Sequence, residues 1–194
     1  MSRIEDLIRA DLEESLALKG AMLEQMGEAI ERAAEMLIEC YRRGGKVLLC
    51  GNGGSAADAQ HFAAEMVGRF LRERRPLPAI ALHTNTSTLT AIGNDYGYEQ
   101  TFTRPLAAYG VEGDVLVAIS TSGNAPNVCT AAALARQLKM RVIGMTGASG
   151  GRLAELAEVM LAVPSNVTPR IQEGHVTLVH LLCHAVEEEL FASG

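Results

Sequence analysis

The residues best suited to chemistry lie in and just after a glycine-rich turn. Residues 51–55 read Gly-Asn-Gly-Gly-Ser and follow an apolar run, 46–50, that is typical of a buried strand. Glycines at a strand end let the backbone approach a ligand, and the free N–H groups of the next helix favour an anion. His61 and Glu65 come four residues apart on that expected helix and so share a face. The pattern predicts chemistry on a small phosphorylated molecule, although the spacing alone also fits an ordinary surface pair.

Two better-known phosphate loops do not fit this segment. A dinucleotide-binding loop requires an acidic residue at the end of the next strand. Here the next apolar run, 78–82, leads into His83-Thr84-Asn85, which contains no carboxylate. A Walker loop requires Gly-Lys followed by Ser or Thr, and none follows. The polar Asn52 and Ser55 suit a monophosphate instead.

A second loop offers hydroxyl groups. Ser120, Thr121 and Ser122 directly follow the apolar run 115–119. Three consecutive hydroxyls at a strand-to-helix turn can give O–H and N–H donors to one phosphate. A third loop, from Thr146 to Gly151, follows the run 142–145.

The last expected helix, from about residue 170 to 190, carries polar groups among apolar ones. These groups are Gln172, Glu173, His175, His180 and His184. His180 and His184 are one turn apart and could bind a metal, while Gln172 and His180 share a face two turns apart. The spacing does not choose between these pairs. For each histidine, a core residue bonded to a carbonyl group is an equal alternative.

The surrounding pattern indicates an α/β fold. Residues 4–43 read as two helices that end at Gly44-Gly45. The candidate strands are the apolar runs 46–50, 79–82, 115–119, 142–145 and 159–163. Their alternation with helical stretches predicts a doubly wound parallel sheet in a single domain, with ligands outside the carboxyl ends of the strands.

Two polar stretches have ordinary interpretations. Asn94 and Asp95 follow a short helical stretch, 86–92, and their neighbours Gly93 and Gly97 favour a turn. The one basic cluster, residues 69–75, is interrupted by a glutamate and is expected to be a solvated helix end.

Composition narrows the class of protein. The net charge of −6 over 194 residues argues against a general nucleic-acid binder. Cys40, Cys50, Cys129 and Cys183 form no C-x-x-C pair and are expected to be free thiols. No run approaches the roughly 20 apolar residues of a membrane span, and the first residues lack a signal peptide. We expect a soluble, cytoplasmic protein without nucleic-acid or membrane partners.

Taken together, these motifs resemble those of the phosphoheptose isomerases, which have the sugar isomerase (SIS) fold. The likeness rests on residues 51–55, 93–95, 120–124 and 170–173, together with His61 and Glu65, and spans essentially the whole chain. It implies an SIS-type doubly wound, five-stranded parallel sheet flanked by helices. It also implies one SIS domain over residues 1–194, with a helical extension (1–44) used in oligomerisation and an α/β sugar-phosphate-binding core (45–194). The assembly implied is a homotetramer.

The resemblance further implies a reaction and a set of roles. The reaction converts D-sedoheptulose 7-phosphate into D-glycero-D-manno-heptose 7-phosphate through an enediol, for bacterial heptose and lipopolysaccharide synthesis. Glu65 and His180 are the implied catalytic residues, and His61, Glu65, Gln172 and His180 the implied ligands of one zinc ion (Zn2+) per subunit. The implied substrate-binding residues are Asn52, Gly53, Gly54, Ser55, Glu65, Asn94, Asp95, Ser120, Thr121, Ser122 and Gln172.

One position departs from the family pattern. Members commonly carry a serine where this chain has Ala125, so one phosphate hydroxyl is missing. Two alternatives follow. One is an isomerase of another sugar phosphate, and the other is a non-catalytic SIS-fold protein that binds the replication initiator. The non-catalytic relative lacks the glutamate that matches Glu65, and this chain keeps it.

Overall fold

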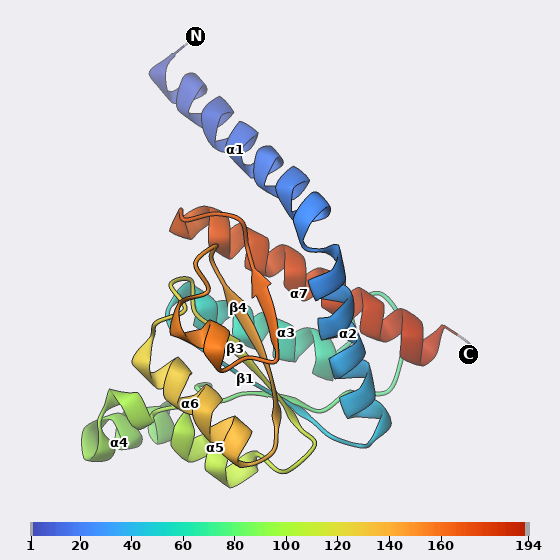
Figure 1. The fold of residues 1–194 in the computed structure, drawn as a ribbon, viewed down its shortest axis with the longest axis vertical. Coiled ribbons are helices and arrows are strands. Elements are labelled where there is room, and N and C mark those ends of the chain that lie inside the picture. The colour runs from blue at the N-terminus through green and yellow to red at the C-terminus, as the bar shows by residue number, and fades with distance from the viewer. Residues whose placement is uncertain (1, 193–194) are drawn as a thin grey trace.

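The computed structural model describes residues 2–192 and begins with two helices. The first, α1 (Arg3–Gln25), starts where the Ser2 hydroxyl accepts a hydrogen bond from the Glu5 amide, and α2 (Gly27–Arg42) follows after Met26. The two helices expected over residues 4–43 are therefore confirmed. Most of α1 extends away from the rest of the molecule, and α2 packs beside the C-terminal helix (Figure 1).

Five parallel strands form the centre of the protein. They are β1 (Val47–Gly51), β2 (Ala79–Ala81), β3 (Val115–Ile119), β4 (Arg141–Thr146) and β5 (Val159–Ala162). Their order in the sheet is β2-β1-β3-β4-β5, and every neighbouring pair is parallel. The five predicted strands are all present, and no end differs from the prediction by more than one residue.

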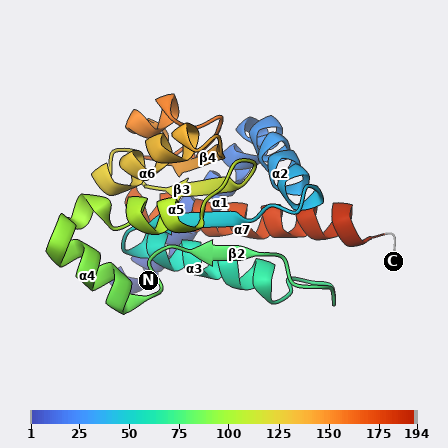
Figure 2. The same cartoon turned by 90° about the horizontal axis from the view of Figure 1, so that it is seen from below.

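Helices cover both faces of this sheet (Figure 2). The remaining helices are α3 (Gly54–Val67), α4 (Thr86–Tyr96), α5 (Thr103–Tyr109), α6 (Pro126–Gln137) and α7 (Thr168–Phe191), with short 3-10 turns η1 (Tyr98–Gln100) and η2 (Gly151–Glu155). Alternate residues of a strand point to opposite faces. Accordingly, Leu49 packs into a core with α2, α3 and α7, whereas Leu48 packs into a second core with α5 and α6. The doubly wound arrangement is confirmed.

The strand order places two of the chemically interesting loops side by side. The chain leaves β1 toward β2 in one direction and continues to β3, β4 and β5 in the other, so the sheet changes winding direction between β1 and β3. Gly51, the last residue of β1, is in register with Ile119, the last residue of β3. The loops that follow these strands therefore start together at the carboxyl edge, where doubly wound proteins bind ligands.

Two expectations about local structure are wrong. Asn94 and Asp95 do not form a turn, because α4 continues through Tyr96 and ends only at Gly97, whose φ of +88° favours glycine. The basic cluster is not a helix end, because α3 stops at Val67. The Arg74 side chain is only 1% exposed, so this member of the cluster is not solvated either.

All four cysteines are free and buried, as the sequence predicts. In the part of the chain that the structure describes, no helix has the length and apolar character needed to cross a membrane.

Candidate active site

The glycine-rich loop opens onto the N-terminus of α3. Gly53 is the N-cap of that helix with a φ of +56°, and no side chain among residues 2–192 caps it. The amides of Ser55 and Ala56 bond to the carbonyls of Asn52 and Gly53, so Gly54 has the one amide in the first turn of α3 without a partner among the described residues, and this amide can bind an anion. Gly54 lies so close to α7 that an added Cβ would overlap the side-chain amide of Gln172. Any larger residue would therefore move the end of the Gln172 side chain away from this turn.

Asn52 is held in the same loop by a reciprocal amide pair. Its Nδ2 donates to Asn127 Oδ1 at 2.9 Å, and Asn127 Nδ2 donates to Asn52 Oδ1 at 3.0 Å. The Tyr98 hydroxyl donates to the same Asn52 oxygen at 3.0 Å. Asn127 is 2% exposed and was not singled out from the sequence. It follows Pro126 at the start of α6, and only the tertiary fold shows its partner.

The hydroxyl loop after β3 is fixed by backbone contacts with the loop after β4. The Gly147 amide donates to the Thr121 carbonyl at 2.9 Å, and the Leu153 amide donates to the Gly123 carbonyl at 3.0 Å. Ser120 is buried, whereas Ser122 is exposed and its hydroxyl accepts from the Asn124 amide at 3.2 Å. The loop thus presents hydroxyl and amide groups from a rigid backbone next to the glycine-rich turn.

Three candidate side chains meet between α3 and α7. His61 Nε2 lies 3.0 Å from His180 Nε2 and 3.3 Å from Glu65 Oε1. If both rings are neutral, one carries its proton on Nε2 and the other on Nδ1, because a hydrogen bond between two nitrogens needs one donor and one lone pair. The Glu65 side chain is 25% exposed, so the cluster faces solvent and can be reached by a ligand.

The structure decides between the histidines of the last helix. His180 contacts His61, whereas His184 lies 3.6 Å from Glu188 and belongs to the solvent-exposed surface. His175 is fully buried and its Nε2 lies 3.2 Å from the Thr146 carbonyl oxygen, so it is a core histidine bonded to a carbonyl. Burial lowers the pKa of His175 to about 4, despite the opposing hydrogen bond to Thr146.

A buried acid beside the cluster did not stand out in the sequence. Asp58 lies on α3 one turn before His61 and is 7% exposed. Within residues 2–192, its Oδ2 atom has no hydrogen-bond partner. Burial raises the pKa of Asp58 to about 6, although His61 acts in the opposite direction. The two residues between Asp58 and His61, Ala59 and Gln60, gave no indication that this aspartate faces inward.

The implied zinc site is only partly assembled. Imidazole nitrogens and carboxylate oxygens are the ligands that zinc accepts, and two such ligands bound at about 2.0–2.1 Å with tetrahedral angles lie roughly 3.3–3.4 Å apart. The contacts of His61 with His180 and Glu65, at 3.0 and 3.3 Å, are close to that separation. Among residues 2–192, however, no three His, Cys, Asp or Glu side chains form a metal-binding group. The donor types of His61, Glu65 and His180 fit zinc, and Gln172 is the fourth ligand that the family resemblance implies.

Asn94 and Asp95 are not brought to this cluster. Their side chains bond to each other at 2.8 Å on the exposed surface of α4. Within the described part of the chain, no hydrogen bond or ion pair joins either residue to the glycine-rich loop, the hydroxyl loop or α7. A role for them in this site therefore stays a prediction.

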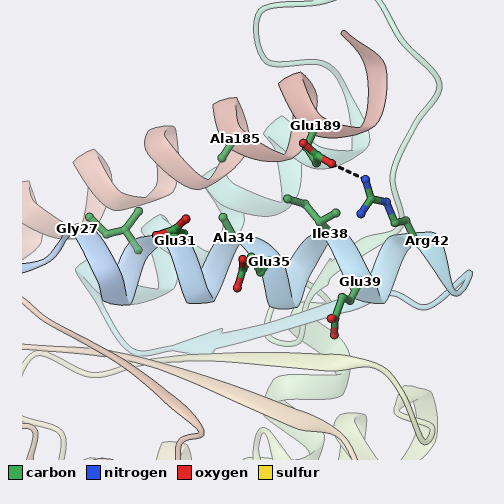
Figure 3. Close-up of a pocket in the computed structure, with 10 residues that line it drawn as sticks. Gly27, Glu31, Ala34, Glu35, Ile38, Glu39, Arg42, Ala185 and Glu189 are labelled. Carbon is green, nitrogen blue, oxygen red and sulfur yellow. Dashed lines mark hydrogen bonds and ion pairs between the residues drawn. The ribbon is translucent and has the colours of Figure 1, made fainter. Parts of the chain in front are cut away.

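Two of the grooves along α7 differ in the candidate residues that line them. One, of about 590 Å³, lies between α1 and α7 and includes Gln172 and His180 among its lining residues. The other, of about 660 Å³, lies between α2 and α7, and none of the candidate residues lines it (Figure 3). Its walls carry Glu31, Glu35 and Glu39, while Arg42 is paired with Glu189. An acidic groove of this kind disfavours a phosphorylated ligand.

Comparisons with known proteins identify the family of this chain. Residues 12–147 match the model of the SIS domain. A phosphoheptose isomerase of Geobacter sp. (strain M21) is 54% identical over 194 residues, which cover 100% of this chain and 99% of the relative. The structure of a phosphoheptose isomerase from Neisseria gonorrhoeae superposes with a TM-score of 0.91 at 45% identity, covering 95% of this chain and 99% of that one. The structure of another from Francisella tularensis gives a TM-score of 0.92 at 41% identity, covering 97% and 100%.

Proposed function

The chain belongs to the SIS domain family, and we propose that it is an isomerase that converts D-sedoheptulose 7-phosphate into D-glycero-D-manno-heptose 7-phosphate. The family resemblance seen in the motifs is confirmed by the domain match and the relatives. The observation that carries the proposal is the meeting of His61, Glu65 and His180 at the helix that begins at the glycine-rich loop. This arrangement supplies an acid–base cluster next to an anion-binding site.

The binding part of the site suits a sugar phosphate. The α3 N-terminus and Ser55 offer donors on one side, and the loop from Ser120 to Ser122 offers donors on the other. Both loops start at the same edge of the sheet because Gly51 and Ile119 are in register. Asn52, whose orientation Asn127 and Tyr98 fix, is placed to bind a sugar hydroxyl.

The catalytic part of the site suits proton transfer between neighbouring carbons. Glu65 takes a proton from carbon 1 of the ketose while His180 gives a proton to the oxygen on carbon 2, which yields the cis-enediol. His180 then takes the proton from the oxygen on carbon 1, and Glu65 returns its proton to carbon 2. The product is the aldose. Both residues return to their original protonation states, so no other reactant is consumed.

Zinc is proposed as the metal of this site, held by His61, Glu65, Gln172 and His180. When bound, it would supply a Lewis acid that stabilises negative charge on the substrate oxygens. Support comes from the donor types and from the closeness of the His61 nitrogen to the Glu65 and His180 atoms.

A homotetramer is proposed because α1 presents an apolar stripe that the same chain does not cover. Leu7, Leu12 and Leu16 are 59%, 60% and 70% exposed on a helix that extends away from the body of the protein (Figure 1). Ile4 and Ile8 are also exposed along α1. Contiguous apolar surface of this kind marks an association face. Helix α1 would then serve the assembly, as the resemblance implies.

A cytoplasmic location and a place in heptose synthesis for surface polysaccharide are proposed with this activity. Four free, buried cysteines support a reducing compartment. A second candidate function is isomerisation of another sugar phosphate. It is favoured by Ala125, because the chain lacks the serine hydroxyl that family members commonly have at this position of the phosphate loop.

The proposal is tested by turnover of D-sedoheptulose 7-phosphate, with and without added zinc. We expect Glu65→Gln and His180→Gln to reduce kcat by about a hundredfold or more, in line with the loss of a general acid or base. The matched control is His184→Gln, because His184 lies one turn further along α7 and outside the cluster. Full turnover by Glu65→Gln would refute the assignment. No turnover by the folded, zinc-supplied wild type would favour the second candidate.

A further inference from the structure

A buried ion pair connects the two helices that carry the proposed catalytic residues. Glu187 on α7 is fully buried, and Arg74, in the segment between α3 and β2, has a side chain only 1% exposed. Arg74 Nε donates to Glu187 Oε1 at 2.8 Å. Charged groups are rarely buried without a full set of partners. The partners of this pair therefore indicate what it holds in place.

The Glu187 carboxylate binds the backbone of the segment that follows α3. Its Oε1 accepts the Phe70 amide at 2.7 Å, and its Oε2 accepts the amides of Leu71 and Arg72 at 2.7 and 3.0 Å. Burial would raise the pKa of Glu187, but these three amides and Arg74 outweigh it and leave the pKa below its usual range. Glu187 therefore remains a carboxylate that fixes three consecutive residues.

The Arg74 guanidinium reaches the other way, to the end of α3. Its two terminal nitrogens donate to the Met66 carbonyl and the Glu65 carbonyl, both at 2.9 Å. These carbonyls belong to the last turn of the helix, where carbonyl groups have no N–H donor within the helix. The backbone of Glu65 is thus bound to α7 through one arginine and one glutamate.

The same contacts place an aromatic ring against His180. Phe70, whose amide Glu187 holds, has its ring centroid 5.5 Å from that of His180. Glu187 and His180 are seven residues apart on α7 and so lie on one face, two turns from each other. A single charged pair therefore controls both the end of α3 at Glu65 and the packing of the His180 imidazole.

We propose that the Glu187–Arg74 pair, with Phe70, positions Glu65 and His180 relative to each other for proton transfer. Arg74, Glu187 and Phe70 act through the catalytic residues and are positioning residues. The inference rests on the proposed function, since it assigns a role to Glu65 and His180. It predicts that a change in the hydrogen bonds of the Arg74 guanidinium alters turnover more than it alters substrate binding.

The sharpest variant is Arg74→Lys. Lysine keeps the positive charge beside Glu187 but cannot reproduce the planar fork that reaches Glu187 and both carbonyls. The matched control is Arg72→Lys, because the Arg72 side chain pairs with the exposed Glu188 and has no contact with the carbonyls of α3. Phe70→Leu is the second variant. It keeps the amide that binds Glu187 and removes only the ring.

The expected result is a split between kcat and KM. Arg74→Lys and Phe70→Leu should lower kcat by roughly tenfold to a hundredfold, because small displacements of reacting groups have effects of that size. KM should stay within about twofold, and Arg72→Lys should match the wild type, as expected for an exposed ion pair. A folded Arg74→Lys or Phe70→Leu with wild-type kcat would overturn the proposal. An equal loss in Arg72→Lys would also overturn it.

A second readout needs no substrate and separates this inference from the proposed reaction. The chain has 5 histidines, so the His180 ring resonance can be assigned in isotope-labelled protein by its absence from His180→Gln. We expect it to move in Arg74→Lys and Phe70→Leu, because the ring current of Phe70 changes, and to stay in Arg72→Lys. A shift confined to these two variants supports the positioning role even if the wild type does not turn over the heptulose. An unmoved resonance in both variants would refute it.

Discussion

Removing Arg74 should destabilise the fold strongly. Arg74→Met keeps much of the aliphatic bulk but leaves the Glu187 carboxylate buried with three backbone amides as its only donors among the described residues. Loss of one partner from a buried ion pair typically costs about 3–5 kcal/mol. For a chain of this length, that corresponds to a fall in Tm of about 6–20 °C. The control Arg72→Met removes an exposed pair and should cost about 0–1 kcal/mol.

The assay is thermal and chemical unfolding at one fixed protein concentration, since association also affects Tm. A double-mutant cycle isolates the contribution of the ion pair to the free energy of unfolding. In the Glu187→Gln background, Arg74 is a buried cation without its carboxylate, so Arg74→Met removes an uncompensated charge and should cost less than about 1 kcal/mol or stabilise the fold. Equal costs in both backgrounds, within about 0.5 kcal/mol, would refute the reasoning.

The same prediction has a pH dependence. The pKa of Glu187 lies below its usual range, so the pair stabilises the fold above the unfolded-state pKa of Glu187 and loses this contribution as the pH falls through its folded-state pKa. The difference between wild type and Arg74→Met should therefore be complete near about pH 7 and should narrow below 4.5, the ordinary glutamate value. A difference that grows on acidification would contradict the assignment.

Three further changes test the remaining parts of the account. Gly54→Ala adds a Cβ that overlaps the Gln172 side-chain amide, so the Gln172 side chain must move. We expect kcat/KM to fall at least about tenfold with little change in Tm, and wild-type kinetics would contradict the contact. Ala125→Ser should lower KM by about tenfold, because a hydrogen bond to a charged group contributes about 1.5–3 kcal/mol, and an unchanged KM would argue against the phosphate loop. Leu12→Glu should produce a smaller species in sedimentation, whereas an intact tetramer would show that α1 is not the association face.

Much of the fold could be predicted from local patterns. Strands buried on both faces of a parallel sheet are continuously apolar, and the five runs found in the sequence are the five strands. The pattern also places the glycine-rich and hydroxyl loops at one edge of the sheet, because both come directly after strands of a parallel sheet. The pairing of β1 with β3, which sets the two loops side by side, is known only from the structure. Even Gly97 gave a usable stop signal, although the turn residues before it suggested that α4 ends earlier.

The partners of the polar side chains could not be predicted. Whether His61 meets His180 or His184 depends on how α3 and α7 rotate against each other, and both spacings look alike in the sequence. Arg74 lies in a basic cluster that looks solvated, and its partner Glu187 is 113 residues away. Such long-range pairs are set by tertiary packing, which leaves no periodic trace in the local sequence.

The central claim, proton transfer by Glu65 through an enediol, is tested most directly by isotope exchange in heavy water. Sedoheptulose 7-phosphate is incubated with the zinc-supplied enzyme, and deuterium at carbons 1 and 2 is followed by NMR and mass spectrometry. The account predicts that solvent deuterium enters carbon 2 of the aldose and, through reversal, carbon 1 of the ketose, and that Glu65→Gln abolishes both. Turnover without any deuterium, or exchange that persists in Glu65→Gln, would contradict it.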